Sequence, residues 1–219
     1  MTDWITRPAD IAEGSFAIIQ RELAEAGHTF EPNTGAVVER IIHSTADFEF
    51  ADITRFSPGA IEAGVAALQS GCAVVTDVNM IRVGVSSTRL AHFGGAAHCF
   101  VADPQARQRA EAEQNTRSAI GIRMAAENGL LSGGIAAVGN APTALYEVIN
   151  LIEEGTKPAL IIGVPVGFIS TVESKEALLK VTTVPWITTV GRKGGSTIAV
   201  AIVNALLRLA ADAPVQEVD

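Results

Sequence analysis

Apolar side chains recur every three or four positions through the first third of the chain, which is the spacing of an amphipathic helix. Residues 10–26 carry this pattern, and a second copy of it follows residue 33. A third lies in "SPGAIEAGVAALQSG", where Ser57 and Pro58 have the chemistry of a cap and a first-turn residue. The pattern therefore predicts three helices before residue 72.

Short β-branched segments predict strands, beginning with "CAVVTDVNM" directly after the third helix. The second half of the chain then repeats a strand, a turn and a helix. The units are "GGIAAVGNAPTALYEVINLIEEG", with Pro142 in the first helical turn, "KPALIIGVPVGF" with "ESKEALLK", and "VPWITTV" with "GRKGGSTIAVAIVNALLRLA". Consecutive units of this kind predict a parallel sheet covered by helices, so the fold class is α/β.

In open parallel sheets, ligands bind beyond the carboxyl ends of the strands. This rule selects four turns as the functional edge, at residues 77–79, 139–140, 163–167 and 191–196. We expect one domain over residues 1–211. The segment 212–219 has no apolar periodicity, and we expect a flexible tail there.

Composition narrows the possible ligands. The 219 residues are 48% hydrophobic but only 5% aromatic, with 20 glycines, which suits helices packed on a sheet. A formal net charge of -8 disfavours nucleic acid and anionic membranes as partners, so any anionic ligand needs a local basic site. No apolar run approaches the roughly 20 residues of a membrane span, and the first residues lack a secretory signal. Cys72 and Cys99 form no CxxC pair, which favours free thiols and a reducing cytoplasm.

Several familiar motifs are missing. "GIAAVGNAP" has the glycine spacing of a P-loop, but Asn140 and Ala141 stand where Lys and Ser or Thr would hold phosphate and magnesium. No GxGxxG follows a strand, and no GxSxG elbow is present. The four histidines have no metal-ligand spacing, so we expect no metal site and no bound cofactor.

Two turns remain as candidate carboxylate sites. In one, Arg192 and Lys193 precede the glycine-rich start of the last helix, where free N–H groups and the helix dipole favour anions. In "QNTRSA", Asn115 or Thr116 can cap a helix while Arg117 offers a bidentate fork. Each is also compatible with an ordinary cap beside a solvated basic residue.

His43, in the helical segment "RIIHSTADFEF", is the remaining candidate for acid or base chemistry, because its side chain titrates near neutral pH. Taken alone, a histidine beside an apolar helical stripe is compatible with a structural role. Nothing in the sequence supports a functional role for His28, His92 or His98, which we interpret as structural.

The segments "SFAII", "IIHSTADFEF", "NTRSA", "VGNAPTAL", "GVPVGF", "ESKEAL" and "GRKGGST" resemble, in order and spacing, those of the precorrin-8X methylmutases of cobalamin biosynthesis. The resemblance spans residues 11–207. It implies a flavodoxin-like three-layer α/β/α fold and a homodimer whose active sites receive residues from both subunits. It also implies an isomerase that moves a methyl group from C-11 to C-12 of a corrin precursor without a cofactor. The product is hydrogenobyrinate, or cobyrinate where cobalt was inserted early.

The same resemblance implies roles for individual residues. The family's essential histidine falls on His43 and its substrate-contacting arginine on Arg117. Ser15 in "GSFAII" matches a substrate-contacting position, as does Ser86 in "VGVSSTR", where the family often has threonine. The substrate carries many acetate and propionate groups, and the chain that binds them is acidic overall. We therefore also expect Arg89 and Lys193 to donate hydrogen bonds to the substrate carboxylates.

A 1,5-sigmatropic methyl shift needs a polarised macrocycle, and a histidine can supply that polarisation by lending a proton. Glu39 and Asp47 stand four residues before and after His43, so either carboxylate could favour the protonated imidazole, unless both point into water. Two rival functions remain: a non-catalytic tetrapyrrole carrier, and a flavodoxin-like nucleotide module that would bind FMN or NAD.

Overall fold

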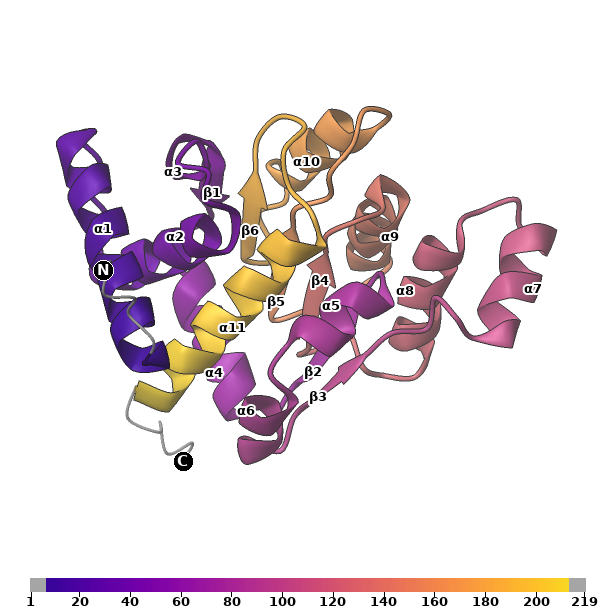
Figure 1. Cartoon of the computed structure of the whole chain (residues 1–219). Helices are drawn as coiled ribbons and strands as arrows, with labels where there is room; N and C mark the ends of the chain where they lie inside the picture. The colour runs from indigo at the N-terminus through magenta and orange to yellow at the C-terminus, as the bar shows by residue number, and fades with distance from the viewer. Residues whose placement is uncertain (1–6, 213–219) are drawn as a thin grey trace.

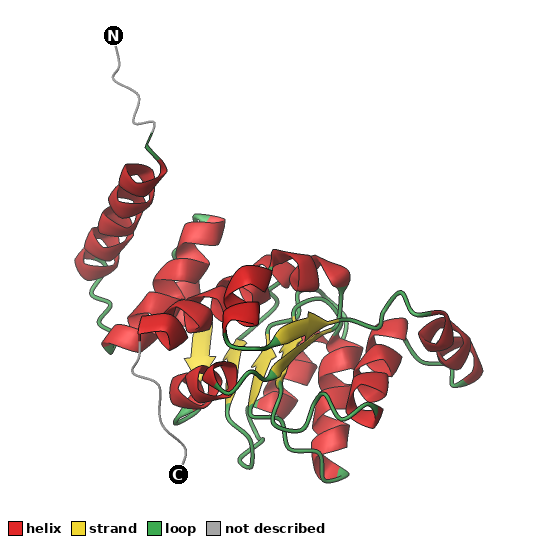
Figure 2. Cartoon of the chain, turned by 90° about the horizontal axis from the view of Figure 1, so that it is seen from below, coloured by secondary structure: helices red, strands yellow, loops and turns green. Residues whose placement is uncertain are grey.

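The computed structural model describes residues 7–212, and its centre is a six-stranded sheet with helices on both faces (Figures 1 and 2). The strand order is β1-β6-β5-β4-β2-β3. The strands are β1 (Thr54–Phe56), β2 (Ala73–Thr76), β3 (Ala96–His98), β4 (Ile135–Val138), β5 (Leu160–Gly163) and β6 (Trp186–Thr189). All neighbours are parallel except β1, which pairs antiparallel with β6.

The five parallel strands confirm the predicted fold class. Numbered along the chain from β2, they lie in the order 2-1-3-4-5, which is the flavodoxin-like arrangement. Every residue of β4, β5 and β6 is buried, as expected for strands covered on both faces, and this explains their continuous apolar runs. The sequence pattern did not reveal β1 or β3, because three residues are too few to establish a period.

Helices from the two ends of the chain cover one face of the sheet. They are α1 (Pro8–Glu25), α2 (Pro32–Thr45), α4 (Ala60–Gln69), α5 (Asn79–Gly84), α6 (Ser87–His92) and α11 (Ser196–Asp212). Figure 1 shows α11 running across the middle of this face, with α1 and α2 on one side of it and α5 on the other. The short α3 (Phe50–Ile53) leads into β1. The resulting apolar cluster joins α2, α4 and α11 to the sheet.

The opposite face carries α8 (Arg117–Glu127), α9 (Pro142–Glu153) and α10 (Thr171–Leu178), which enclose a second apolar cluster. Outside α8, α7 (Pro104–Ala112) packs through a small cluster of its own. Within residues 7–212 no helix has the length and apolar character needed to cross a membrane.

The boundaries of α1, α2 and α9 match the sequence pattern, whereas the start of α4 does not. α1 and α2 begin and end close to the predicted positions, and Pro142 opens α9 as expected. The predicted cap of the third helix is wrong, because α4 begins at Ala60 after Gly59 with φ of 72°. The Ser57 hydroxyl instead accepts the N–H of Trp186 at 2.7 Å, which ties the turn to the start of β6.

The last helix ends one residue later than the expected end of the domain at residue 211. α11 includes Asp212, so the first residue of the expected tail is helical. The rest of that tail, residues 213–219, lies outside the described residues.

Asp77 closes the crevice between β2 and β4, the place where the strand order reverses. Its carboxylate accepts the N–H groups of Gly139 (3.1 Å), Asn140 (2.9 Å) and Ala141 (2.7 Å) at the start of α9. The side chain is 1% exposed, and burial raises the pKa of Asp77 although the three donors act in the opposite direction. The turn at residues 139–140, one of the four predicted at the functional edge, is therefore occupied by a carboxylate of the protein itself.

We expect Asp77→Ala to lower the free energy of unfolding by about 2–3 kcal/mol, because it leaves three N–H groups without their acceptor in a buried turn. Urea unfolding of the purified variant measures this loss. Asp103→Ala is the matched control, since the exposed carboxylate of Asp103 caps α7 through a single bond to the Gln105 N–H. That control should lose about 1 kcal/mol. Equal losses in the two variants would contradict the structural role given to Asp77.

Candidate functional site

His43 lies in the last turn of α2 and stacks on Phe16 of α1. The two ring centroids are 4.8 Å apart and the ring planes differ by 8°. His43 as a residue is exposed. A stacked aromatic neighbour restricts the orientation of the ring, so the imidazole presents its nitrogen atoms in a defined direction at the surface of the helical layer.

Three arginines from three helices lie near one another beside this stack. Arg40 precedes His43 by one turn of α2, and its guanidinium carbon lies 5.7 Å from the centroid of the Phe16 ring. Arg208 comes from α11 and Arg89 from α6, and both lie close enough for their charges to lower the pKa of Arg40, after the larger effect of burial. Across residues 7–212, none of the three arginines forms an ion pair. An acidic chain thus has a local excess of positive charge beside His43.

The charges around His43 disfavour its protonated form, so the structure answers the question that the sequence left open about Glu39 and Asp47. Partial burial lowers the pKa of His43, and the charges of Arg40 and Arg208 lower it further. The carboxylates of Glu39 and Asp47 have other partners. Glu39 accepts a hydrogen bond from the side-chain amide of Gln20 at 2.9 Å, and Asp47 accepts one from the Lys193 ammonium at 2.5 Å.

The end of α2 explains why Asp47 pairs with Lys193. The helix stops at Thr45, and Ala46 adopts a left-handed conformation with φ of 55°. Helical spacing therefore no longer applies at Asp47, whose side chain lies against Lys193 rather than the imidazole. The ligand-free site favours the neutral form of His43.

A cleft of about 230 Å³ lies beside the Phe16 ring, between α2 and α11. Its lining combines the basic side chains with a small apolar wall and two carboxylates. The lining residues are Phe16, Ala36, Glu39, Arg40, Ala205, Arg208, Leu209 and Asp212. A cleft of this size holds only part of a macrocycle, because pockets for drug-sized ligands already occupy about 300–1,000 Å³.

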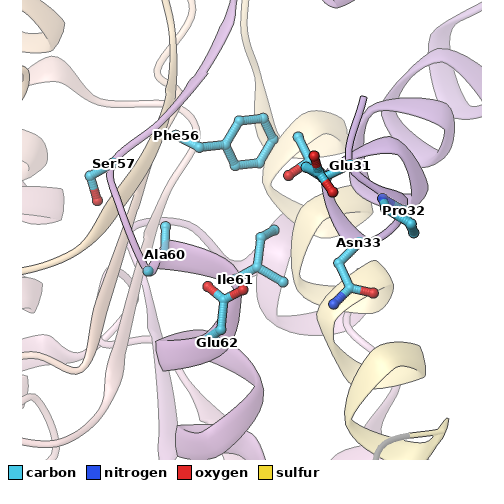
Figure 3. Close-up of a pocket in the computed structure, with 10 residues that line it drawn as sticks. Glu31, Pro32, Asn33, Phe56, Ser57, Ala60, Ile61 and Glu62 are labelled. Carbon is cyan, nitrogen blue, oxygen red and sulfur yellow. The ribbon is translucent and has the colours of Figure 1, made fainter. Parts of the chain in front are cut away.

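A larger hollow of about 490 Å³ lies at the opposite end of α2, where α2 and α4 begin (Figure 3). Figure 3 shows Glu31 and Glu62 among the side chains that line it, together with Phe56 and Ile61. Its lining contains no basic side chain. The smaller cleft also has two carboxylates, but it has Arg40 and Arg208 beside them, so it is the better candidate for a polycarboxylate ligand.

The predicted contact residues Ser15, Ser86 and Arg89 lie on the same helical layer as His43. Ser15 directly precedes Phe16 in α1, and its hydroxyl donates to the Ile11 carbonyl at 2.7 Å. Ser86 caps α6 by accepting the Arg89 N–H at 3.4 Å, and its own N–H donates to Asn204 of α11 at 2.9 Å. The bond to Asn204 holds the start of α6, and with it Arg89, against α11.

Arg117 lies elsewhere, as the first residue of α8 on the opposite face of the sheet. The chain does not bring Arg117 to His43. Of the two predicted caps for α8, Thr116 is the one observed, with its hydroxyl accepting the Ala119 N–H at 3.2 Å.

Lys193 is already paired in this structure. Its ammonium lies 2.5 Å from Asp47 and 2.8 Å from Glu49, and these contacts fasten the glycine-rich turn to the segment after α2. The N–H of Gly195 donates to the Val164 carbonyl at 2.8 Å, so it is not free for an anion. Backbone packing also constrains the turn, because a Cβ at Gly194 would lie 2.3 Å from the same carbonyl oxygen.

The side chain of Lys175 stabilises the glycine-rich turn through hydrogen bonds to its backbone. Its side chain, on α10, is 1% exposed, and its ammonium donates to Thr189 Oγ1 at 3.1 Å, the Gly191 carbonyl at 3.1 Å and the Lys193 carbonyl at 2.6 Å. No carboxylate of the described part of the chain forms an ion pair with it, and burial lowers the pKa of Lys175 to about 8. The buried ammonium is therefore a positioning group for the turn that carries Lys193.

Large apolar side chains remain exposed beyond the carboxyl ends of two strands. After β5, Phe168 is 80% and Ile169 is 85% exposed, and the Arg192 guanidinium carbon lies 5.3 Å from the centroid of the Phe168 ring. After β2, Met80 and Val83 of α5 are 65% and 70% exposed. Exposed apolar groups of this size at a functional edge indicate a surface that contacts another molecule.

Sequence reasoning missed Phe16, Arg40 and Arg208. Arg40 had a detectable signal, because it stands three residues before His43 on the same helix. Phe16 lies inside the quoted segment "SFAII", but nothing local connects it with His43. Arg208 gave no signal in the sequence. Among the described residues, no cluster of three or more His, Cys, Asp or Glu side chains could hold a metal ion.

Comparison with known proteins gives a consistent result. Residues 10–209 match the family model described as precorrin-8X methylmutase. The cobalt-precorrin-8 methylmutase of Leptospira interrogans is 48% identical over 206 residues, covering 91% of this chain and 93% of that protein. The precorrin-8X methylmutase of Pseudomonas aeruginosa is 39% identical, with 94% and 98% covered. A crystal structure of precorrin-8x methyl mutase from Thermus thermophilus has a TM-score of 0.87 and 45% identity, with 96% and 100% covered.

Replacing Lys175 with methionine should change how stability depends on pH. Between about pH 8 and the ordinary lysine value of 10.5, the unfolded chain keeps a proton on Lys175 that the folded protein has lost. The unfolded state then binds more protons, so the wild type gains stability relative to Lys175→Met as pH rises, by up to about 1.4 kcal/mol per pH unit.

Urea unfolding of both proteins at intervals from pH 7 to pH 10 measures this difference. Lys180→Met, which removes an exposed lysine just after α10, is the matched control for the loss of one ammonium group. A constant difference between wild type and Lys175→Met across that range would show that the folded protein retains the proton.

Proposed function

The chain belongs to the precorrin-8X methylmutase family, and from that premise we propose which of its residues perform the reaction. The protein is an isomerase of cobalamin biosynthesis, an intramolecular transferase that moves a methyl group from C-11 to C-12 of precorrin-8X or its cobalt form. The observation that supports the assignment of the site is the stack of His43 on Phe16, beside three arginines that form no ion pair with any other described residue.

His43 is the proposed proton donor. Its imidazolium gives a proton to a ring nitrogen or an adjacent carbon of the macrocycle, which makes C-12 more electrophilic. The methyl group then migrates from C-11 to C-12 with its bonding electrons, and the proton returns to His43. No atom is gained or lost, as an isomerisation requires. General acid catalysis of this kind contributes typically 10²–10⁴-fold.

The remaining predicted residues bind the rim of the substrate. Arg89, Ser15 and Ser86 lie on the helical layer that carries His43, so they are suited to the acetate and propionate arms. A guanidinium forms bidentate bonds with a carboxylate, whereas a hydroxyl donates a single one. Lys193 can contribute only by exchanging Asp47 or Glu49 for a substrate carboxylate.

A second copy of the chain completes the proposed site. The cleft of about 230 Å³ is too small for the macrocycle, and Arg117 lies on the face opposite His43. The exposed side chains Phe168 and Ile169 offer an apolar surface for a partner. We therefore assign a homodimer in which Arg117 of one subunit reaches the substrate bound at His43 of the other. The free thiols Cys72 and Cys99 support a reducing cytoplasm as its compartment.

His43→Ala and His43→Asn should lower kcat by about 10²–10⁴-fold while product binding persists, because only the proton transfer is lost. Anaerobic incubation with precorrin-8X, followed by the absorption spectrum of hydrogenobyrinate, measures turnover, and repeating it with the cobalt form identifies the preferred substrate. His28→Asn, at a histidine 3.7 Å from Asp52, is the control. If the wild type binds hydrogenobyrinate but converts no precorrin, a carrier replaces the enzyme.

Mixing two inactive variants tests the shared site. If Arg117 acts across the dimer, a mixed dimer of His43→Asn and Arg117→Ala subunits has one intact site and one doubly altered site. Random exchange should then restore about one quarter of the wild-type rate, because about half of the dimers are mixed. Size-exclusion chromatography establishes the dimer. No recovery after complete subunit exchange would place Arg117 and His43 in the same subunit's site.

A further inference from the structure

Arg40, Arg89 and Arg208 form a cluster of like charge beside His43, and none of the three forms an ion pair within residues 7–212, although the carboxylates of Glu39 and Asp212 line the same cleft as Arg40 and Arg208. Arg40 is half-buried, and its burial and the charges of Arg208 and Arg89 disfavour its protonated form. Like charges at close range repel one another more strongly where water is partly excluded. The cluster therefore has a standing electrostatic cost in the ligand-free protein, which an anion bound between the guanidinium groups would relieve.

Other charged groups near His43 do not supply that anion. From α2, Glu39 is held by Gln20 and Asp47 by Lys193. From α11, Asp212 lines the same cleft as Arg208 at its far end, in the last residue of the helix. From α1, the neighbour is the uncharged ring of Phe16. The charges that act on the imidazole are thus those of Arg40 and Arg208.

We propose that Arg40 and Arg208 each bind a carboxylate of the corrin precursor, and that this binding makes His43 a proton donor only when substrate is present. The inference rests on the proposed function, since it needs His43 as the acid. It adds two positioning residues to the site and a link between substrate binding and proton uptake.

The physical basis is a change in charge around one imidazole. Without substrate, partial burial and the charges of two guanidinium groups lower the pKa of His43 and so disfavour a proton on the ring. A carboxylate on each guanidinium cancels the repulsion and adds negative charge nearby, so the ring takes up a proton from solvent. The polycarboxylate substrate thereby creates the acid that its own methyl migration needs.

The geometry suits this arrangement. Arg40 and Arg208 both line the cleft of about 230 Å³. Its apolar wall is formed by Phe16, Ala36, Ala205 and Leu209, and the carboxylates of Glu39 and Asp212 complete the lining. That space accommodates carboxylate arms but not the ring system. The macrocycle would lie outside the cleft, near the stacked rings of Phe16 and His43. Arm binding and proton donation then occur at adjacent places on the same helical layer.

The test is an NMR titration of protein labelled with ¹⁵N at histidine, with and without bound hydrogenobyrinate. His43→Asn identifies the signals of His43. We expect the His43 midpoint to rise by about one pH unit or more on binding. Calorimetry in two buffers of different ionisation enthalpy should show net proton uptake near neutral pH when hydrogenobyrinate binds.

Arg208→Met and Arg40→Met separate this role from a structural one. In the free protein, each substitution should raise the His43 midpoint, because a repelling charge is gone. On ligand binding, each should reduce the further rise. Arg208 is exposed, so its variant should fold even if Arg40→Met does not. The control is Arg21→Met on α1, an exposed arginine 3.7 Å from Glu25, which should leave both midpoints unchanged.

One result overturns the inference without touching the proposed function: an identical His43 midpoint in the free and bound protein, with wild-type turnover and an inactive His43→Asn. The inference also fails if Arg208→Met leaves the ligand-induced rise intact. A wild-type protein that shows the rise but converts no precorrin-8X supports the linkage and overturns the catalytic role alone.

Discussion

Burial of the apolar stripe of α2 is the constraint on which the site depends. Val37, Val38, Ile41 and Ile42 are at most 1% exposed, in the cluster that α2 forms with α11 and the sheet. With residues 41 and 42 in the core, residues 40 and 43 must flank it at the surface of the layer. The aliphatic packing therefore directs Arg40 and His43 outward together. The same packing places α11, and with it Arg208, beside them.

The fold and the site are only loosely connected. The sheet has the order of a flavodoxin-like protein, in which ligands bind at the crevice between the first and third parallel strands. Here Asp77 fills that crevice by accepting three N–H groups at the start of α9. A phosphate cannot take these donors while the carboxylate holds them, which argues against a nucleotide module. The basic cleft lies instead in the helical layer, between α2 and α11.

Local charge matters more to this protein than net charge. A chain of net charge -8 keeps three arginines around His43 without acidic partners in residues 7–212, whereas Lys193 has two. Arginines kept without partners are suited to receive carboxylates, because a bound ligand need not displace an internal ion pair first. The paired Lys193, supported by the buried Lys175, instead stabilises the shape of the glycine-rich turn.

Local patterns in the sequence were enough to predict α1, α2, the three strand and helix units and the parallel sheet, because helix and strand periods depend on neighbours a few residues apart. They also singled out His43 as the candidate acid, with the support of a family resemblance. Tertiary structure alone decided that Phe16 stacks on His43, that Arg208 lies beside it, and that Arg117 is on the opposite face. It also decided that Asp47 lies outside the helical register of His43, because Ala46 ends α2 in a left-handed conformation. These contacts join helices distant in sequence, so they depend on how the layers pack, which no local period records.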